Sequence, residues 1–327
     1  MRSVGMNYRR NSMGLTIVGT VAFDNLTTPF GSKMGILGGS ATHAAMAARF
    51  FCPVSLVSVV GDDFSPEIMQ DIQNAGIRTV GVQVKKGFKT FSWTGAYEYD
   101  MSQARTIKTE LDILNVFEPQ IPVDQSDQDF VFLANLDPEL QLKALAQIKV
   151  PRFVALDSMN LWIQSKKEVL LKVIAKANLL VLNEAEIRQL TQETNLLKAA
   201  RRVHDLGPTW VLIKRGEHGA TLYSKQSFFS VPAYPLEEVF DPTGAGDALA
   251  GGFIGYLANT QEFSEINLRR ATVVGSCMAS FIVEAFGCER LQGLTIDEIE
   301  DRFQEFISFA RVDMPVPVWD RRMVSVS

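Results

Sequence analysis

The chain has 327 residues, of which 46% are hydrophobic and 21% charged, and its formal net charge is −5. These values predict a globular protein with a large core, and they exclude a mainly disordered chain, a basic nucleic-acid-binding surface and, since no window holds about 18 uninterrupted apolar residues, a membrane span. The cysteines Cys52, Cys277 and Cys288 have no C-x-x-C spacing, which argues against a disulfide framework or a zinc site and favours a reducing, cytoplasmic location.

Both ends of the chain are expected to lie outside the folded part. Residues 1–13 are basic but lack the apolar stretch of a signal peptide, so they are interpreted as a disordered extension. Residues 312–327 lack hydrophobic periodicity and are interpreted as an irregular tail. One domain over 14–311 remains, because no linker or shift in composition divides it.

Strand and helix patterns alternate along this domain. Apolar runs predict strands at 15–20, 54–61, 129–135, 153–157, 178–182 and 210–214. Helical patterns fall at 41–51, 66–75, 138–148, 166–177, 195–206, 246–258, 268–286 and 296–310. This order predicts an α/β fold with three layers, αβα, around a mostly parallel sheet. Period-two alternation at 80–85 and 91–99 predicts a small antiparallel sheet, and 221–223 with 228–231 predicts a hairpin.

A glycine-rich turn carries the strongest functional pattern. It runs from Asp241 to Asp247 as DPTGAGD and opens a helix of small residues. The backbone N–H groups of Gly244, Ala245 and Gly246 can converge on an anion, and the helix N-terminus adds partial positive charge. The Asp247 carboxylate then fits a general base that takes a proton from a hydroxyl attacking a bound phosphorus. The alternative is that Asp247 only caps the helix.

Four further features stand at predicted strand ends or helix starts. They are Asp24, the Gly38-Gly39 pair, Asn183 with Glu186, and the segment from Lys214 to Gly219. Ligands of open parallel sheets bind at the carboxyl ends of strands, so we expect these features to meet at one site. Together with the Asp247 turn, they resemble the ribokinase-like carbohydrate kinases, also called the PfkB family, in order and separation over about residues 15–310.

The resemblance implies a role for each matching residue. It makes Asp247 the catalytic base and the amides of Gly244, Ala245 and Gly246 an anion hole. The implied cofactors are ATP and Mg²⁺, together with K⁺ near Asp241 and residues 284–287. The implied nucleotide contacts are Asn183, Lys214, Gly216, Gly219 and Thr243, with Glu186 positioning Mg²⁺ largely through water. The implied acceptor contacts are Asp24, Gly38, Gly39, His43 and Trp93.

The resemblance also implies a β-sheet lid over the acceptor. We place this lid at about residues 80–99, together with 26–37, and expect a homodimer formed through it.

Two departures from the ribokinase pattern concern the acceptor, because Ala22 and His43 stand where that pattern has Asn. Ribose is therefore predicted to be a poor substrate.

The leading function is an ATP-dependent phosphotransferase acting on a hydroxyl of a sugar or sugar-like small molecule. A nucleoside kinase of the same family stays open, because an aromatic lid residue such as Trp93 suits a sugar face or a purine. A non-catalytic sugar or nucleotide sensor is less favoured, because a sensor needs no general base. A dehydrogenase is poorly supported, because no G-x-G-x-x-G follows the first strand.

Overall fold

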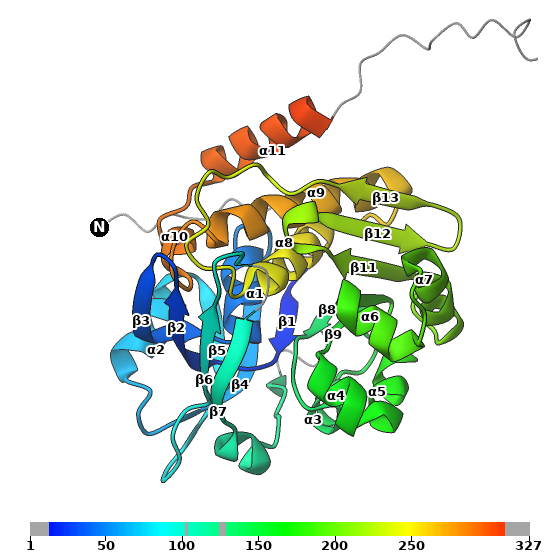
Figure 1. Ribbon diagram of the computed structural model, residues 1–327. Coiled ribbons are helices and arrows are strands. Elements are labelled where there is room, and N and C mark those ends of the chain that lie inside the picture. Colours follow the sequence, from blue (N-terminus) through cyan, green and yellow to red (C-terminus); the bar gives the residue numbers. More distant parts are fainter. Residues whose placement is uncertain (1–12, 102–103, 124–128, 311–327) are drawn as a thin grey trace, which may run out of the picture.

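Within residues 13–101, 104–123 and 129–310, which the computed structural model describes, the strands gather in two sheets (Figure 1). The larger sheet consists of β1 (Leu15–Val18), β4 (Val54–Gly61), β5 (Ile77–Lys85), β8 (Phe130–Leu133), β9 (Phe153–Asp157), β10 (Leu179–Asn183), β11 (Trp210–Lys214), β12 (Ala220–Ser224) and β13 (Phe228–Val231). Apart from Met13, the predicted extension and the whole predicted tail lie outside the described residues.

The strand order of the larger sheet is β13-β12-β11-β10-β9-β8-β1-β4-β5. Neighbouring strands are parallel from β5 to β11, and β12 and β13 add an antiparallel edge. From β1 the chain builds the sheet in one direction through β4 and β5, and then in the other through β8 to β11. Such a reversal leaves a crevice at the carboxyl ends of the strands, where open α/β sheets bind ligands.

Helices cover both faces of the larger sheet. The helices are α1 (Ser40–Ala48), α2 (Pro66–Asn74), α3 (Pro138–Leu145), α4 (Asn160–Ser165), α5 (Lys167–Ile174), α6 (Glu184–Thr191), α7 (Leu196–Asp205), α8 (Ala245–Thr260), α9 (Glu265–Ile282), α10 (Glu289–Gln292) and α11 (Ile296–Ala310). Of these, α10 and α11 pack mainly against α9. One apolar core lies under α1, α8 and α9, and the other lies under α3, α5, α6 and α7. The predicted three-layer α/β fold is therefore confirmed.

Small residues let α8 pack directly against α1. A Cβ on Gly251 would lie 2.2 Å from the Ala44 carbonyl oxygen, so only glycine permits this approach of the two backbones. The helix that begins at the glycine-rich turn is thus fixed against the helix that follows Gly39. This packing sets the distance between the two halves of the predicted site.

The second sheet is small and mixed. It consists of β2 (Ala22–Thr28), β3 (Gly31–Gly38), β6 (Ser92–Tyr97) and β7 (Ala104–Glu110), in the order β3-β2-β6-β7. The predicted lid segment 26–37 lies in it, and so does the part 92–97 of the predicted segment 80–99, although β2 and β6 pair in parallel rather than antiparallel.

The prediction was wrong for 80–85. These residues belong to β5, which pairs in parallel with β4 at the edge of the larger sheet. Val80 is 77% exposed while Ile77 is buried, so the period-two pattern reflects an edge strand with one face open to solvent.

Candidate active site

The predicted site residues converge at the carboxyl edge of the larger sheet. Asn183 ends β10 and lies in register with Lys214 at the end of β11, and Asp157 ends the neighbouring β9. The glycine-rich turn enters α8 beside them, because a Cβ on Gly246 would lie 2.7 Å from Lys214 Cδ. Sequence features that are spread along the chain from Asp24 to Asp247 thus meet in one cluster of charged side chains and backbone amides.

A buried carboxylate braces the glycine-rich turn. Asp241 is fully buried, and its two carboxylate oxygens accept the backbone N–H groups of Thr243 at 2.9 Å and Gly287 at 3.0 Å. Gly244 then adopts φ +79°, a left-handed conformation, and α8 begins at the next residue. The Ala245 amide donates to the Pro242 carbonyl at 3.2 Å, so it would have to share this bond to join an anion hole.

Asp247 lies in the first turn of α8, and its side chain is 22% exposed. Burial, together with the negative charges of Asp157, Asp24 and Glu186, raises the pKa of Asp247 to about 8, and the positive charge of Lys214 opposes this shift. A carboxyl group whose pKa lies near neutrality is suited to accept a proton during catalysis.

Asp24 and the glycine pair, which are predicted to bind the acceptor, lie together in the structure. Asp24 is only 5% exposed, and a backbone hydrogen bond from Gly39 reaches its carboxylate. Burial, followed by the charge of Asp241, raises the pKa of Asp24 to about 7. A Cβ on Gly38 would lie 1.9 Å from Asp24 Oδ2, and Gly39 has φ +95°, so both positions require glycine. Three residues predicted to bind acceptor hydroxyls therefore lie in mutual contact.

His43 lies behind the glycine-rich turn. It is 1% exposed, and a Cβ on Gly244 would lie 2.4 Å from its Cγ. Burial lowers the pKa of His43 to about 4, so the imidazole is neutral near pH 7. Its Nδ1 is 4.0 Å from Asp247 Oδ2, and within the described residues its buried Nε2 has no hydrogen-bond partner. His43 is therefore adjacent to Asp247 and Gly244, and its contact with an acceptor stays a prediction.

Asn183 and Glu186 form a capping box at the start of α6. The Asn183 N–H donates to Glu186 Oε2 at 2.7 Å, and the Glu186 N–H donates to Asn183 Oδ1 at 2.8 Å. Burial, followed by the charge of Asp157, raises the pKa of Glu186, and Lys214 opposes this shift. The box holds the Glu186 carboxylate at the strand edge, so its structural role and its predicted Mg²⁺ role are compatible.

The two glycines predicted to line the nucleotide have different structural roles. Gly219 has φ +85°, and a Cβ there would lie 2.1 Å from the Val231 carbonyl oxygen, so glycine is required for packing against β13. Gly216 has φ +55° and faces open space, where a Cβ would meet nothing within 4 Å. Of the two, Gly216 has room beside it for a ligand.

The small sheet touches the glycine-rich turn. The Tyr97 hydroxyl lies 3.1 Å from Thr243 Oγ1, and the Phe30 and Phe240 rings are 5.1 Å apart. Trp93 lies in register with Asp24, packs over Gly95, and donates from Nε1 to Thr106 Oγ1 at 3.1 Å. An aromatic ring thus stands on the strand next to the predicted hydroxyl-binding carboxylate.

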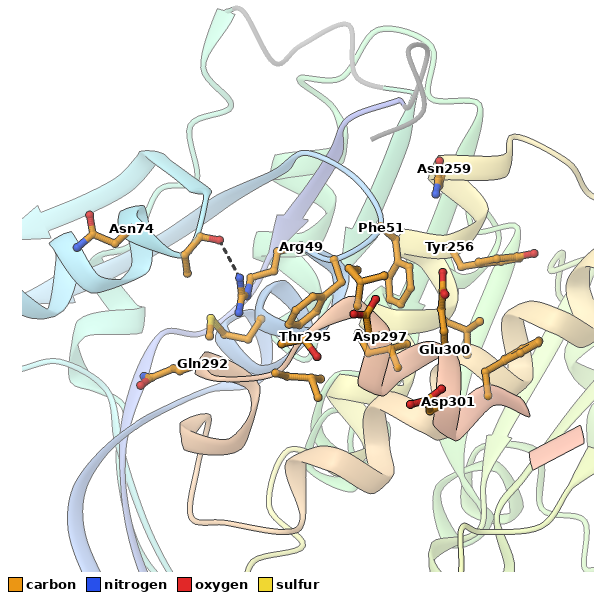
Figure 2. A pocket seen from close by; sticks show the side chains of 18 of the residues that line it. Arg49, Phe51, Asn74, Tyr256, Asn259, Gln292, Thr295, Asp297, Glu300 and Asp301 are labelled. Atoms are coloured by element: carbon orange, nitrogen blue, oxygen red, sulfur yellow. Dashed lines mark hydrogen bonds between the residues drawn. The ribbon is translucent and has the colours of Figure 1, made fainter. Parts of the chain in front are cut away.

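A large groove lies elsewhere, between α11 and the helices α1, α2, α8 and α9. Its volume is about 1620 Å³, and Figure 2 shows Arg49, Tyr256 and Asp297 among the side chains around it. The predicted site residues are absent from its lining. The groove and the cluster of predicted site residues at the strand edge are therefore separate features of the surface.

Within residues 13–101, 104–123 and 129–310, no three His, Cys, Asp or Glu side chains gather as a group that could bind a metal ion. No helix in the same ranges is long and apolar enough to cross a membrane.

Comparisons with known proteins agree on one family. The model for "pfkB family carbohydrate kinase" matches residues 15–290. A cytidine kinase of Thermococcus kodakarensis is 31% identical over 271 residues, which cover 80% of this chain and 96% of that protein.

Solved structures share the fold. The nucleoside kinase of Methanocaldococcus jannaschii, described as an archaeal member of the ribokinase family, has a TM-score of 0.72 at 22% identity and covers 90% of this chain and 98% of its own. A putative ribokinase II from E. coli, solved in complex with ATP and Mg²⁺, has a TM-score of 0.73 at 20% identity, with coverages of 90% and 99%.

Proposed function

This chain belongs to the pfkB family of carbohydrate kinases, and on that premise we propose that it transfers the terminal phosphoryl group of ATP to a hydroxyl of a nucleoside. As a member it is a phosphotransferase with a hydroxyl acceptor. The observation that carries the proposal is the pair of interacting carboxylates, the buried Asp24 and the partly exposed Asp247 at the end of the glycine-rich turn.

A nucleoside is favoured over a free sugar by similarity and by geometry. The cytidine kinase match extends over 96% of that protein at 31% identity. Trp93 stands in register with Asp24, so a ribose held by Asp24 brings its base toward an aromatic ring. A pentose or another sugar remains the second candidate, because Asp24, Gly38 and Gly39 address hydroxyl groups that both classes of acceptor carry.

The proposed reaction places each side chain in one role. Asp24 and the backbone at Gly38 and Gly39 orient the acceptor. Asp247 takes the proton of the attacking hydroxyl. The amides at the start of α8 and the Lys214 ammonium stabilise charge on the phosphoryl group. Glu186 offers a carboxylate to Mg²⁺, a hard cation that prefers oxygen ligands and retains water. The ion, when bound with ATP, neutralises negative charge on the phosphate oxygens.

Three further proposals remain from the sequence. The Asp241 turn with residues 284–287 would hold K⁺, and the protein would act in the cytoplasm.

The small sheet would form a homodimer, since Met34 on β3 and Ile107 on β7 are 71% and 54% exposed. Size-exclusion chromatography with light scattering tests the dimer, and a monomer at micromolar concentration would contradict it.

The transfer can be observed directly by ³¹P NMR. Incubation with ATP, Mg²⁺ and cytidine should give a phosphomonoester signal in proportion to the ADP formed. Formation of ADP with inorganic phosphate only would contradict the proposed acceptor.

Asp24→Asn is expected to raise the acceptor KM by on the order of tenfold or more, since a hydrogen bond to a charged group contributes about 1.5–3 kcal/mol. The ATP KM should stay within about twofold of wild type, because Asp24 is proposed to contact the acceptor and not the nucleotide. Initial-rate kinetics with each substrate varied in turn measure both constants. A rise in the ATP KM alone would mean that the two sides are exchanged.

Glu186→Gln should raise the Mg²⁺ concentration for half-maximal rate severalfold, because an amide is a weaker ligand for a hard cation. Gln can keep the capping box, so the unfolding temperature should change little. Glu184→Gln is the matched control, since Glu184 lies in the same helical turn and pairs with Arg188 and Arg215. An equal shift in both variants would remove the assignment to Glu186.

A further inference from the structure

A buried ion pair lies beneath the phosphoryl-transfer site. Lys214 Nζ is 2.8 Å from Asp157 Oδ2, and the side chains are 18% and 1% exposed. The Ser158 N–H donates to the other Asp157 oxygen at 2.8 Å. The Asp157 carboxylate therefore has two donors, and one of them is a full positive charge.

The pair spans three neighbouring strands. Asp157 ends β9 and lies in register with Val181, whereas Lys214 ends β11 and lies in register with Asn183. The Lys214 side chain thus crosses the end of β10 to reach its partner. A lysine stem is flexible, and this contact fixes where its ammonium group stands.

The fixed ammonium group lies beside the first turn of α8. A Cβ on Gly246 would be 3.2 Å from Lys214 Nζ. The charges of Asp157, Glu186 and Asp247 all act on Lys214. Asp247 is in turn influenced by the negative charges of Asp157, Asp24 and Glu186 and by the positive charge of Lys214.

A contribution to folding stability alone does not explain the Asp157–Lys214 ion pair. Removing two charges from water costs about as much as their attraction returns, so apolar side chains would hold the same strand ends equally well. An ammonium group near developing charge on a phosphoryl group, by contrast, has a direct electrostatic benefit.

We propose that Asp157 is a positioning residue for phosphoryl transfer, which holds the Lys214 ammonium beside the first turn of α8 to stabilise the Asp247 carboxylate and the phosphoryl group in transit. This inference rests on the proposed kinase function. It adds Asp157, a residue outside the predicted site, and gives Lys214 a defined partner.

A double-mutant cycle of Asp157→Asn and Lys214→Met tests whether the two residues act together. Each single variant should lower kcat by on the order of tenfold or more, with the acceptor KM within about threefold of wild type. The double variant should lose no more than Lys214→Met alone, because Asp157 acts through Lys214. Lys214→Arg, which keeps the charge, should recover part of the rate.

Asp137→Asn is the matched control, because Asp137 forms another Asp–Lys pair, with Lys166 at 2.7 Å, and neither residue belongs to the glycine-rich turn or to the predicted site. It should leave kcat unchanged. Additive losses in the double variant would show that Asp157 acts independently of Lys214 and would overturn the proposal.

Calorimetry separates failure of this inference from failure of the proposed function. The preference for AMP-PNP over ADP, measured with excess Mg²⁺, should fall by on the order of tenfold in both single variants and no further in the double variant. This measurement needs no turnover, so it stands even if no acceptor is phosphorylated. An equal loss of affinity for both nucleotides, or no loss, would contradict a place for Lys214 beside the transferred phosphoryl group.

Discussion

Replacing Asp247 by Asn should lower kcat by about 10²–10⁴-fold, the usual contribution of a positioned general base. Asn has nearly the same shape but cannot take the proton of the acceptor hydroxyl. The fold and ATP affinity should be preserved, because the side chain stands in the first turn of α8 without a structural salt bridge to an arginine or lysine in the described residues.

The pH dependence gives this prediction a second readout. Burial raises the pKa of Asp247 to about 8, so in the free enzyme the base is largely protonated below neutrality. Since only the ionised carboxylate accepts a proton, kcat/KM should rise as the pH increases from 6 to 9, with an apparent pKa near 8. In Asp247→Asn this rise of kcat/KM with pH should be absent.

Initial rates of ADP formation, measured over a range of pH, give both the loss of kcat and the pH dependence of kcat/KM. Asp205→Asn is the control, because Asp205 is an exposed carboxylate at the end of α7. Turnover of Asp247→Asn within threefold of wild type would remove Asp247 from the reaction.

Gly246→Val should lower kcat by on the order of 10²–10³-fold, comparable to the loss of one anion-hole donor. The new Cβ would lie 2.7 Å from Lys214 Cδ, and the branched methyl groups would crowd the space where the phosphoryl group is expected. The substitution therefore displaces Lys214 and blocks approach to the start of α8 together.

Gly293→Val separates this effect from the general cost of valine at a glycine position. A Cβ at Gly293 would meet nothing within 4 Å, so that variant should retain wild-type kinetics. Thermal unfolding of both variants shows whether the protein is still folded. Unchanged kinetics in folded Gly246→Val would place the phosphoryl group elsewhere.

Much of the architecture could be predicted from local pattern. The apolar runs that become β4, β9 and β11 are bounded in the structure as expected, at Val54–Gly61, Phe153–Asp157 and Trp210–Lys214. Buried parallel strands are continuous hydrophobic runs, which makes them the clearest elements in such a sequence. Because parallel strands share one carboxyl edge, residues such as Asn183 and Lys214 could be expected to meet there.

Pairing partners and side-chain contacts could not be predicted in the same way. A period-two pattern indicates that one face of a strand is exposed, but it does not indicate which strand pairs with it. The pairing of β5 with β4 depends on the tertiary fold. Asp157 was missed for a related reason. Its role depends on Lys214, which lies 57 residues away in the sequence and two strands away in the sheet. Similarly, the burial of His43 follows from the position of Gly244, which no local pattern fixes.

The most direct test of the central claim is a coupled assay of ADP release over a panel of nucleosides, pentoses, hexoses and sugar phosphates. With ATP and Mg²⁺ present, we expect a nucleoside to give the highest kcat/KM and ribose to be a poor substrate. We also expect this activity to disappear in Asp247→Asn. A sugar or sugar phosphate preferred over every nucleoside would contradict the proposed acceptor. No ADP release above the acceptor-free rate with any member of the panel would contradict the proposed kinase function.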